Sequence, residues 1–218
     1  MSRYTLAIDT SSGTSVALLE GERLIAEKTI ADTMRHAEVI GDALVEVIQS
    51  AGAQSKEISA VVAGRGPAPF TGLRVGLAAA KLFAAGAKVP LFGVVSHDAI
   101  AYAYLAGESR AQVSETKPLL VITDARRKEV YHSLYSGLDS SGAPIRIGEP
   151  AVMSEQLLME HLADRGIDPI RIDGQVSAAD IGRVFAKQLL AGNENRDVSA
   201  LYLRAPDAVP SPGKKVSG

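Results

Sequence analysis

The sequence of 218 residues contains no cysteine and no tryptophan, and only 5% of its residues are aromatic. The lack of cysteine excludes disulfide bonds, thiolate metal sites and cysteine nucleophiles, and it fits a reducing compartment. The net charge is -2 and no block of basic residues occurs. This balance argues against a surface that binds nucleic acid through phosphates by itself, so we expect any RNA role to need a partner.

Long apolar runs are also lacking. No run approaches the ~20 apolar residues that span a bilayer, and residues 1–6 contain no apolar signal core. We therefore expect a cytoplasmic protein that does not enter a membrane. The length suits one large or two small domains with a real core.

The most informative segment covers residues 64–76, between an apolar strand and an alanine-rich helix. Its glycines and two prolines predict a tight, stiff corner in which Thr71 caps the helix. The corner residues are Gly64, Gly66, Pro67, Phe70, Thr71, Gly72 and Arg74. The segment lacks the Gly-Lys-Ser/Thr ending of a P-loop, and Pro69 replaces the third glycine of a dinucleotide-binding fingerprint. A purely structural corner is the alternative to an anion site.

The helix after this corner is apolar over more than half of its circumference, since only Arg74 and Lys81 break the pattern. Such a helix needs cover on two sides, by its own sheet and by a second helix or chain. We expect it to form a partner-binding face together with a helix over 34–51. The predicted interface residues are Ile40, Leu44, Leu73, Gly76, Leu77, Ala80 and Phe83. A central helix enclosed within one domain is the alternative.

The order of predicted elements repeats along the chain. The first half reads as strands over 4–9, 14–20 and 23–30, a helix over 34–51 capped by Asp32 or Thr33, a strand over 58–63, the corner helix over 73–86, a strand over 90–95 and a helix over 96–105. Residues 106–116 read as a linker. The second half reads as strands over 118–124, 128–136 and 144–152, a helix from 154, a strand over 169–173, a helix over 181–190 and a last strand over 200–204.

Each half opens with a buried strand that ends in aspartate, Asp9 or Asp124, and turns into an antiparallel partner. This duplication predicts an α/β fold of the actin, sugar kinase and heat-shock-70 class, with two βββαβα halves and mixed sheets flanked by helices. The predicted subdomains are 1–106, which carries the partner-binding helices, and 107–218, with a loose tail from about 206. In that architecture the hairpins hold phosphate and magnesium.

The candidate remnant of such a phosphate or magnesium site consists of Asp9, Thr10, Ser11 and Asp124. The alternative is that each aspartate caps its own hairpin turn. We expect Arg126 and Arg127 to form salt bridges rather than to bind phosphate.

Several segments together resemble the bacterial TsaB family, also called YeaZ. They are residues 8–11, 15–18, 35–38, 64–76 with Lys81, 124–131 and 202–208. The resemblance implies a subunit of the machinery that installs threonylcarbamoyl on the adenosine beside the anticodon of certain tRNAs. It implies a catalytic TsaD-like partner, a TsaE-like ATPase as third member and a homodimer when the chain is alone. ATP and magnesium are then used by the complex, tRNA is bound only through it, and this chain requires no cofactor.

Two departures from the family pattern concern the nucleotide site. Ala68 and Pro69 stand where the family has glycine and serine, and the glycine-rich segment before the last helix is reduced to residues 173–176. The first departure is expected to stiffen the loop or to narrow what it can hold. The second, together with a short C-terminal half that lacks an obvious glycine pair for holding adenosine, weakens the case for ATP hydrolysis by this chain.

Catalytic side chains in other arrangements are not indicated. The four histidines, His36, His97, His132 and His161, show no metal-ligand spacing. Thr10, Ser11 and Ser12 have no neighbouring base in sequence. Two function classes remain: a non-catalytic scaffold that docks a catalytic relative, and a small ATP-binding kinase or ATPase that works in its own cleft.

Overall fold

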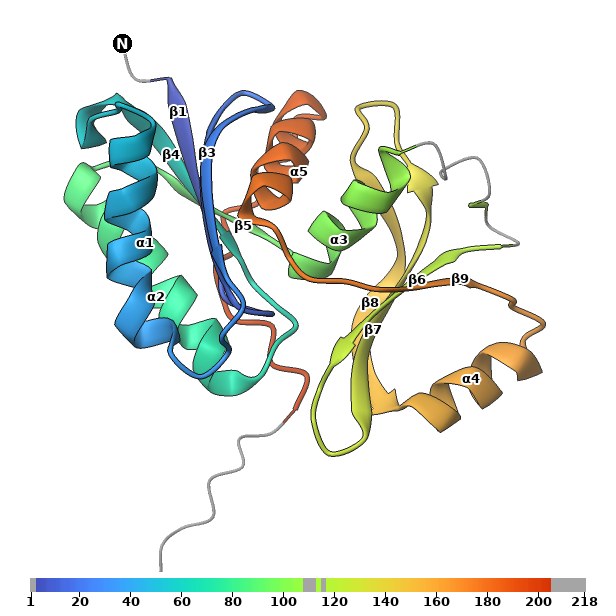
Figure 1. Ribbon diagram of the computed structural model, residues 1–218. Coiled ribbons are helices and arrows are strands. Elements are labelled where there is room, and N and C mark those ends of the chain that lie inside the picture. The colour runs from blue at the N-terminus through green and yellow to red at the C-terminus, as the bar shows by residue number, and fades with distance from the viewer. Residues whose placement is uncertain (1–2, 108–112, 115–116, 205–218) are drawn as a thin grey trace, which may run out of the picture.

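The computed structural model describes residues 3–107, 113–114 and 117–204. Two mixed β-sheets are separated and flanked by helices (Figure 1). The first sheet contains β1 (Tyr4–Asp9), β2 (Thr14–Glu20), β3 (Arg23–Ile30), β4 (Ile58–Gly64) and β5 (Leu91–Val94). The second contains β6 (Leu119–Asp124), β7 (Glu129–Leu138), β8 (Pro144–Ser154) and β9 (Ile170–Asp173). The helices are α1 (His36–Ser50), α2 (Phe70–Ala87), α3 (Ser96–Leu105), α4 (Glu155–Asp164) and α5 (Ala178–Leu190), with a 3-10 turn at Ser55–Glu57.

Both sheets are built around a strand that ends in aspartate. Their orders are β3-β2-β1-β4-β5 and β8-β7-β6-β9, so β1 and β6 occupy equivalent positions. Each pairs antiparallel with the next strand and parallel with the strand after the first helix of its half. The predicted fold class, with its duplicated hairpins and mixed sheets, is confirmed.

The helices are not distributed between the sheets as the two similar halves suggest. α1 and α2 cover the outer face of the first sheet, and α4 covers the outer face of the second. α3, from the first half, packs on the second sheet, whereas α5, from the second half, packs on the first. These two helices form a shared middle layer whose core continues from one sheet to the other. The domain boundary near residue 106 stays a prediction.

Two glycines permit this crossing. A Cβ on Gly182 of α5 would lie 2.5 Å from Leu19 Cδ1 of β2, and a Cβ on Gly174 would lie 2.4 Å from Ile100 Cγ2 of α3. Real Cβ atoms do not approach other carbon atoms so closely. The last helix, α5, can therefore pack closely beside α3. Among the described residues, the second half contains two α-helices and four strands, whereas the first half contains three α-helices and five strands.

Several predicted helix boundaries need correction. α1 begins at His36 after Arg35, and no side chain caps it, because Asp32 accepts the Met34 N–H at 2.8 Å and so closes its own turn. Thr71 lies inside α2, which follows Pro69 directly. Ser154 does cap α4, by accepting the Leu157 N–H at 3.3 Å.

α2 is the single helix, within the described residues, that is long and apolar enough to cross a membrane by length and composition. That test is weak, since core helices of soluble proteins also meet it. Leu73, Leu77 and Ala80 of α2 are buried in the core under the first sheet. The inner side of α2 is therefore part of the core of the folded chain.

The predicted last strand over 200–204 is wrong. Residues 194–204 form an extended strap that crosses the edge of the first sheet at β5. Asn195 accepts the Gly93 N–H at 3.0 Å, and the Leu201 N–H donates to the Arg65 carbonyl at 2.8 Å. These isolated bonds cover the sheet edge without adding a strand to it. The linker residues 108–112 and 115–116, and the tail from 205, lie outside the described residues.

His97 joins the middle layer to the second sheet. Its side chain is fully buried, with Nδ1 at 2.9 Å from Ser133 Oγ and Nε2 at 2.8 Å from Thr123 Oγ1. Burial lowers the pKa of His97 to about 3, helped by the nearby His132 and Arg146. The imidazole is therefore neutral in the folded chain at all ordinary pH values.

Neutral burial of His97 predicts a specific sensitivity to acid. The unfolded imidazole binds a proton below pH ~6.5, whereas the folded one resists it until about pH 3. The free energy of unfolding should therefore fall, through this group, by about 1.4 kcal/mol per pH unit between those limits. Urea unfolding at pH 7 and pH 5 measures this loss. In His97→Asn the drop between the two pH values should be smaller by roughly 2 kcal/mol, and the exposed control His161→Asn should retain it. An equal drop in all three proteins would contradict the prediction.

Candidate functional site

Asp9 lies at the carboxyl end of β1, where its carboxylate is almost completely buried. Oδ1 accepts the Ser11 N–H at 2.7 Å and the Ser11 hydroxyl, and Oδ2 accepts the Ser96 hydroxyl at 2.6 Å. Ser96 Oγ in turn accepts the Gly66 N–H at 3.0 Å. Asp9 thus joins its own hairpin to the glycine corner and to the first residue of α3.

Gly64 is glycine because of this carboxylate. A Cβ at Gly64 would lie 1.7 Å from Asp9 Oδ2 and 2.8 Å from Ser96 Oγ. The position of that Cβ is thus filled by the two oxygens that form the Asp9–Ser96 hydrogen bond. The glycine at the end of β4 therefore serves the packing of Asp9.

The environment of Asp9 does not suit a magnesium ion. Burial raises the pKa of Asp9, and the hydrogen bonds from Ser11 and Ser96 oppose that rise. Magnesium keeps several of its waters when it binds a carboxylate, but at 1% exposure Asp9 has no room for a hydrated ion. The described residues also contain no group of three or more His, Cys, Asp or Glu able to hold a metal. We derive no chemistry through a metal at this position.

Thr10 and the glycines of α2 form the next part of the corner. The Thr10 hydroxyl donates to the Gly72 carbonyl at 2.7 Å and accepts the Gly76 N–H at 3.1 Å. A Cβ at Gly76 would lie 2.3 Å from Thr10 Oγ1, and one at Gly72 would lie 2.9 Å from His36 Nε2. His36 is buried, with Nδ1 at 2.9 Å from Thr14 Oγ1. Burial lowers the pKa of the His36 imidazole.

Two amides of the corner are used within the chain. Those of Gly66 and Gly76 donate to Ser96 and Thr10. These contacts support the structural alternative for residues 64–76 over an anion site. The same packing leaves no room for a Cβ at Gly64, Gly72 or Gly76, which explains why glycine occupies these positions.

The exposed end of the corner carries an aromatic cluster. Phe70 stacks against Tyr202 of the strap with ring centroids 4.7 Å apart, and the Arg74 guanidinium lies 3.7 Å from the Phe70 centroid. Arg74 Nε also donates to the Tyr202 hydroxyl at 2.9 Å. The strap continues to Arg204, which donates to the Ala125 carbonyl at 2.9 Å and pairs with Glu129. It therefore connects the start of α2 with the second hairpin.

Asp124 differs from Asp9 in its surroundings. Its side chain is exposed, caps its own turn by accepting the Arg126 N–H at 2.7 Å, and lines a shallow cavity with Lys128, Ser154 and Glu155. That cavity does not include Asp9. The four residues of the proposed remnant site are thus divided: Asp9, Thr10 and Ser11 lie together, and Asp124 faces solvent on the other hairpin.

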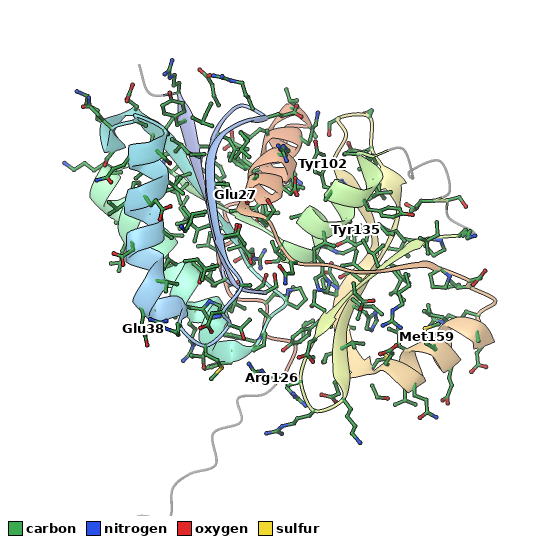
Figure 2. The ribbon with its side chains drawn as sticks, in the orientation of Figure 1. Glu27, Glu38, Tyr102, Arg126, Tyr135 and Met159 are labelled. Atoms are coloured by element: carbon green, nitrogen blue, oxygen red, sulfur yellow. The ribbon has the colours of Figure 1, made fainter. Side chains whose placement is uncertain are left out.

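The start of α5 rests on side chains that the sequence did not single out. Ser15 Oγ accepts the Ala178 N–H at 2.9 Å, and Glu27 accepts the Ser177 hydroxyl at 2.7 Å and the Ala179 N–H at 3.3 Å. A carboxylate at a helix N-terminus is favoured by the helix dipole. Figure 2 shows Glu27 on the side of the first sheet that faces α5. No short-range pattern marks these pairs, because about 150 residues separate their members.

A second polar network that sequence reasoning missed lies between α3 and the second sheet. Asp98 accepts the Tyr135 hydroxyl at 2.8 Å and pairs with Arg146 at 2.7 Å, and Figure 2 labels Tyr135 in this layer. Burial raises the pKa of Asp98, and Arg146 opposes the rise.

The predicted partner interface needs correction. Ile40, Leu73, Gly76, Leu77 and Ala80 are buried in the chain's own core between α1, α2 and the first sheet, and Leu44 and Phe83 are partly buried there. None of the five buried residues is accessible to a partner. The apolar surface of α2 therefore has two parts. One side packs into this core, and the other side is exposed.

The outward side of the helix pair does present apolar groups. Leu82 on α2 is 75% exposed and Val45 on α1 is 54% exposed. The two helices run in the same direction, with His36 beside Gly72 at their starts, so both residues lie in the second half of their helices. Exposed small residues surround them: Gly41, Ala78, Ala85 and Gly86. We call these six residues the outer helix face.

Comparisons with known proteins agree with this architecture. A family model described as TsaD, tRNA N6-adenosine threonylcarbamoyltransferase, matches residues 23–196. The uncharacterized protein ML0378 of Mycobacterium leprae is 33% identical over 94% of this chain, which spans only 56% of that protein's length. The tRNA threonylcarbamoyladenosine biosynthesis protein TsaB of Escherichia coli is 27% identical over 94% of this chain and 84% of its own. YeaZ from Pseudomonas aeruginosa has a similar fold, with a TM-score of 0.72 at 22% identity over 92% of this chain and 100% of its own.

The contact between Gly64 and Asp9 yields a stability prediction. Gly64→Ala should lower the free energy of unfolding by about 2 kcal/mol or more, because the new methyl group overpacks a buried hydrogen-bonded carboxylate. The matched control is Gly86→Ala in α2, where a Cβ meets no atom within 4 Å. There alanine should raise stability by up to about 1 kcal/mol, through its helix propensity. Urea unfolding measures both, and a Gly64→Ala chain as stable as the original would show that Asp9 is not packed as described.

Proposed function

Since the chain belongs to the TsaB (YeaZ) family of the TsaD-like fold, we propose that it is a non-catalytic subunit in tRNA threonylcarbamoyladenosine biosynthesis. In this role it docks a TsaD-like catalytic subunit that transfers threonylcarbamoyl to the adenosine beside the anticodon. The names of three relatives support the pathway. A tRNA N6-adenosine threonylcarbamoyltransferase of Streptococcus pyogenes matches 42% of this chain. This match supports a common origin of the chain and its proposed catalytic partner.

The proposed scaffold role is supported by a contrast between the surroundings of Asp9 and the outer helix face. Asp9, the position that would serve nucleotide chemistry, is buried and hydrogen-bonded within the chain. The outer helix face, by comparison, exposes Leu82 and Val45 among small residues that let another helix approach closely. An exposed apolar surface of this kind is typical of protein-protein contacts.

The full assembly follows from this role. We propose that the outer helix face binds a second copy when the chain is alone and the TsaD-like partner when that is present, so that the two uses compete. A TsaE-like ATPase completes the machinery, tRNA binds to the complex rather than to this chain alone, and the site of action is the cytoplasm. ATP and magnesium are used by the complex, and this chain needs no cofactor of its own.

The competing function, an ATP-binding kinase or ATPase working in its own cleft, has weaker support. It requires a carboxylate that can reach a hydrated magnesium ion beside phosphates. Asp9 is enclosed by Ser11, Ser96 and Gly64. Asp124 is accessible, but its cavity holds two further carboxylates, Glu129 and Glu155, against one cation, Lys128, so that its net charge opposes phosphate.

Docking through the outer helix face is tested by charge insertion. Leu82→Arg should weaken binding to the TsaD-like protein by roughly a hundredfold or more, because an unpaired charge in a desolvated contact costs about 3 kcal/mol. The control is Leu157→Arg, which places the same charge at a leucine that is 57% exposed on α4. Calorimetric titration and light scattering measure heterodimer and homodimer, and circular dichroism verifies folding. A folded Leu82→Arg chain that still associates as well as Leu157→Arg would refute the docking face.

The absence of independent catalysis has its own test. The isolated chain should release no phosphate from ATP and magnesium above background, because Asp9 is closed to the metal. Asp124→Asn, which preserves size and removes the accessible carboxylate, should leave that background unchanged. Magnesium-dependent turnover that disappears in Asp124→Asn or Asp9→Asn would instead favour the kinase alternative.

A further inference from the structure

The outer helix face is bordered by charges of opposite sign. On α1 the exposed residues Glu38, Asp42 and Glu46 form an acidic border, and Figure 2 shows Glu38 directed away from the first sheet. On α2 the exposed residues Arg74 and Lys81 form a basic border. Spacings of four and seven residues place the members of each border on one side of a helix. Within its bounds α1 contains no lysine or arginine, and α2 contains no aspartate or glutamate. Each helix therefore presents charge of one sign only.

The two borders lie on opposite sides of the outer helix face. Glu46 pairs at 2.8 Å with Lys28 of β3, which is one edge strand of the first sheet. Arg74 Nε donates at 2.9 Å to the hydroxyl of Tyr202 in the strap, which crosses the other edge at β5. Since α1 and α2 pack side by side on this sheet, the exposed apolar residues of the outer helix face lie between the two borders (Figure 1).

Contacts within the chain do not account for these charges. Asp42, Arg74 and Lys81 form no ion pair with any residue in the described part of the chain. Asp42 lies four residues from both Glu38 and Glu46, and like charges at that spacing destabilise a helix by a small amount. The separation of acid from base across the face therefore needs an explanation outside the isolated chain.

We propose that the two borders set the orientation in which two copies of this chain associate, with α1 of each copy lying against α2 of the other. The inference rests on the proposed function, because it uses the face that we assign to docking. A two-fold axis parallel to the helix pair brings each acidic border onto a basic border and forms both contacts at once. A two-fold axis across the helices would instead set α1 against α1, and like charges would repeat across the contact. The apolar residues then fill the centre of the interface, and the charges form its rim.

Asp42 and Lys81 are placed to meet in this arrangement. His36 lies beside Gly72 at the starts of the two helices. Asp42 follows His36 by six residues, and Lys81 follows Gly72 by nine residues. At 1.5 Å per residue their positions along the helices differ by about 5 Å, which a lysine side chain can span. Both side chains are exposed and have no ion pair to lose, so their substitution leaves the core intact.

The test exchanges the two charges. Asp42→Lys and Lys81→Glu each convert both contacts of the symmetric dimer into like-charge contacts. Each single variant should raise the dimer dissociation constant about tenfold at about 50 mM salt, and 1 M salt should remove the difference. The double variant Asp42→Lys/Lys81→Glu exchanges the borders and should dimerise like the wild-type chain. An equimolar mixture of the two single variants should also dimerise, because each supplies the charge that the other requires. Analytical ultracentrifugation measures the dissociation constants.

Two substitutions at the end of α4 serve as matched controls. Asp164→Lys and Arg165→Glu change the net charge by the same amounts, at exposed residues far from the outer helix face. Both should leave the dimer dissociation constant unchanged, and circular dichroism verifies that every variant is folded. The proposal is overturned by single variants that dimerise as tightly as their controls, because the borders would then not face each other. It is equally overturned by a double variant as weak as the single variants, or by a wild-type chain that stays monomeric at every concentration.

Binding to the TsaD-like subunit is measured separately by calorimetric titration of the wild-type chain. Lack of binding there contradicts the proposed function, whatever the charge variants show among themselves. Dimers that ignore the exchanged charges contradict the inferred orientation, even where the TsaD-like subunit binds. The two failures are thus distinguishable.

Discussion

The buried carboxylate of Asp9 constrains the centre of this molecule. A carboxylate in an apolar interior must be satisfied by hydrogen bonds, and it receives them from Ser11 in its own hairpin and from Ser96 at the start of α3. The second bond requires glycine at the end of β4, since a Cβ there would overlap Oδ2. It also fixes α3 so that the next residue, His97, reaches Ser133 and Thr123 of the second sheet. One carboxylate thus links two strands of the first sheet, the helix of the middle layer and, through it, the second sheet.

The same bonds change what Asp9 can do. In an open cleft a carboxylate at the end of β1 faces solvent and has lone pairs for a metal ion, whereas here its oxygens serve the packing of α3. The second half shows the opposite case, because Asp124 stays exposed and the described part of its half has one helix and one strand fewer than the first half. A shortened second half leaves less protein to enclose a nucleotide. The physical argument for a scaffold therefore rests on a closed first hairpin and a reduced second half together.

Local patterns in the sequence predicted the strands, the two hairpins and their repetition, because alternation and turn residues act over a few positions. Contacts between elements far apart in the sequence could not be predicted from such local patterns. The apolar face of α5 shows that the helix is covered, but not that the first sheet covers it, and Gly182 acquires its meaning only from Leu19. The apolar arc of α2 was assigned to a partner, although Leu73, Leu77 and Ala80 belong to the core. The outward side of α2 carries Leu82 among small residues. For Asp9 the sequence left two roles open, a remnant metal or phosphate site and a cap of its own turn, and Ser96, which closes it, lies 87 residues away.

α2 connects the outer helix face to the rest of the chain. Its outward side carries Leu82, its first turn carries Phe70 and Arg74, and the strap stacks Tyr202 on that turn before it reaches the β6–β7 hairpin through Arg204. A helix packed on a sheet along its full inner side moves as a rigid element. A partner held on the outer helix face therefore has a fixed position relative to the β6–β7 hairpin, without any conformational change in this chain. In the proposed role, this rigidity lets the chain act by orientation, since it fixes how a bound partner lies relative to the rest of the chain.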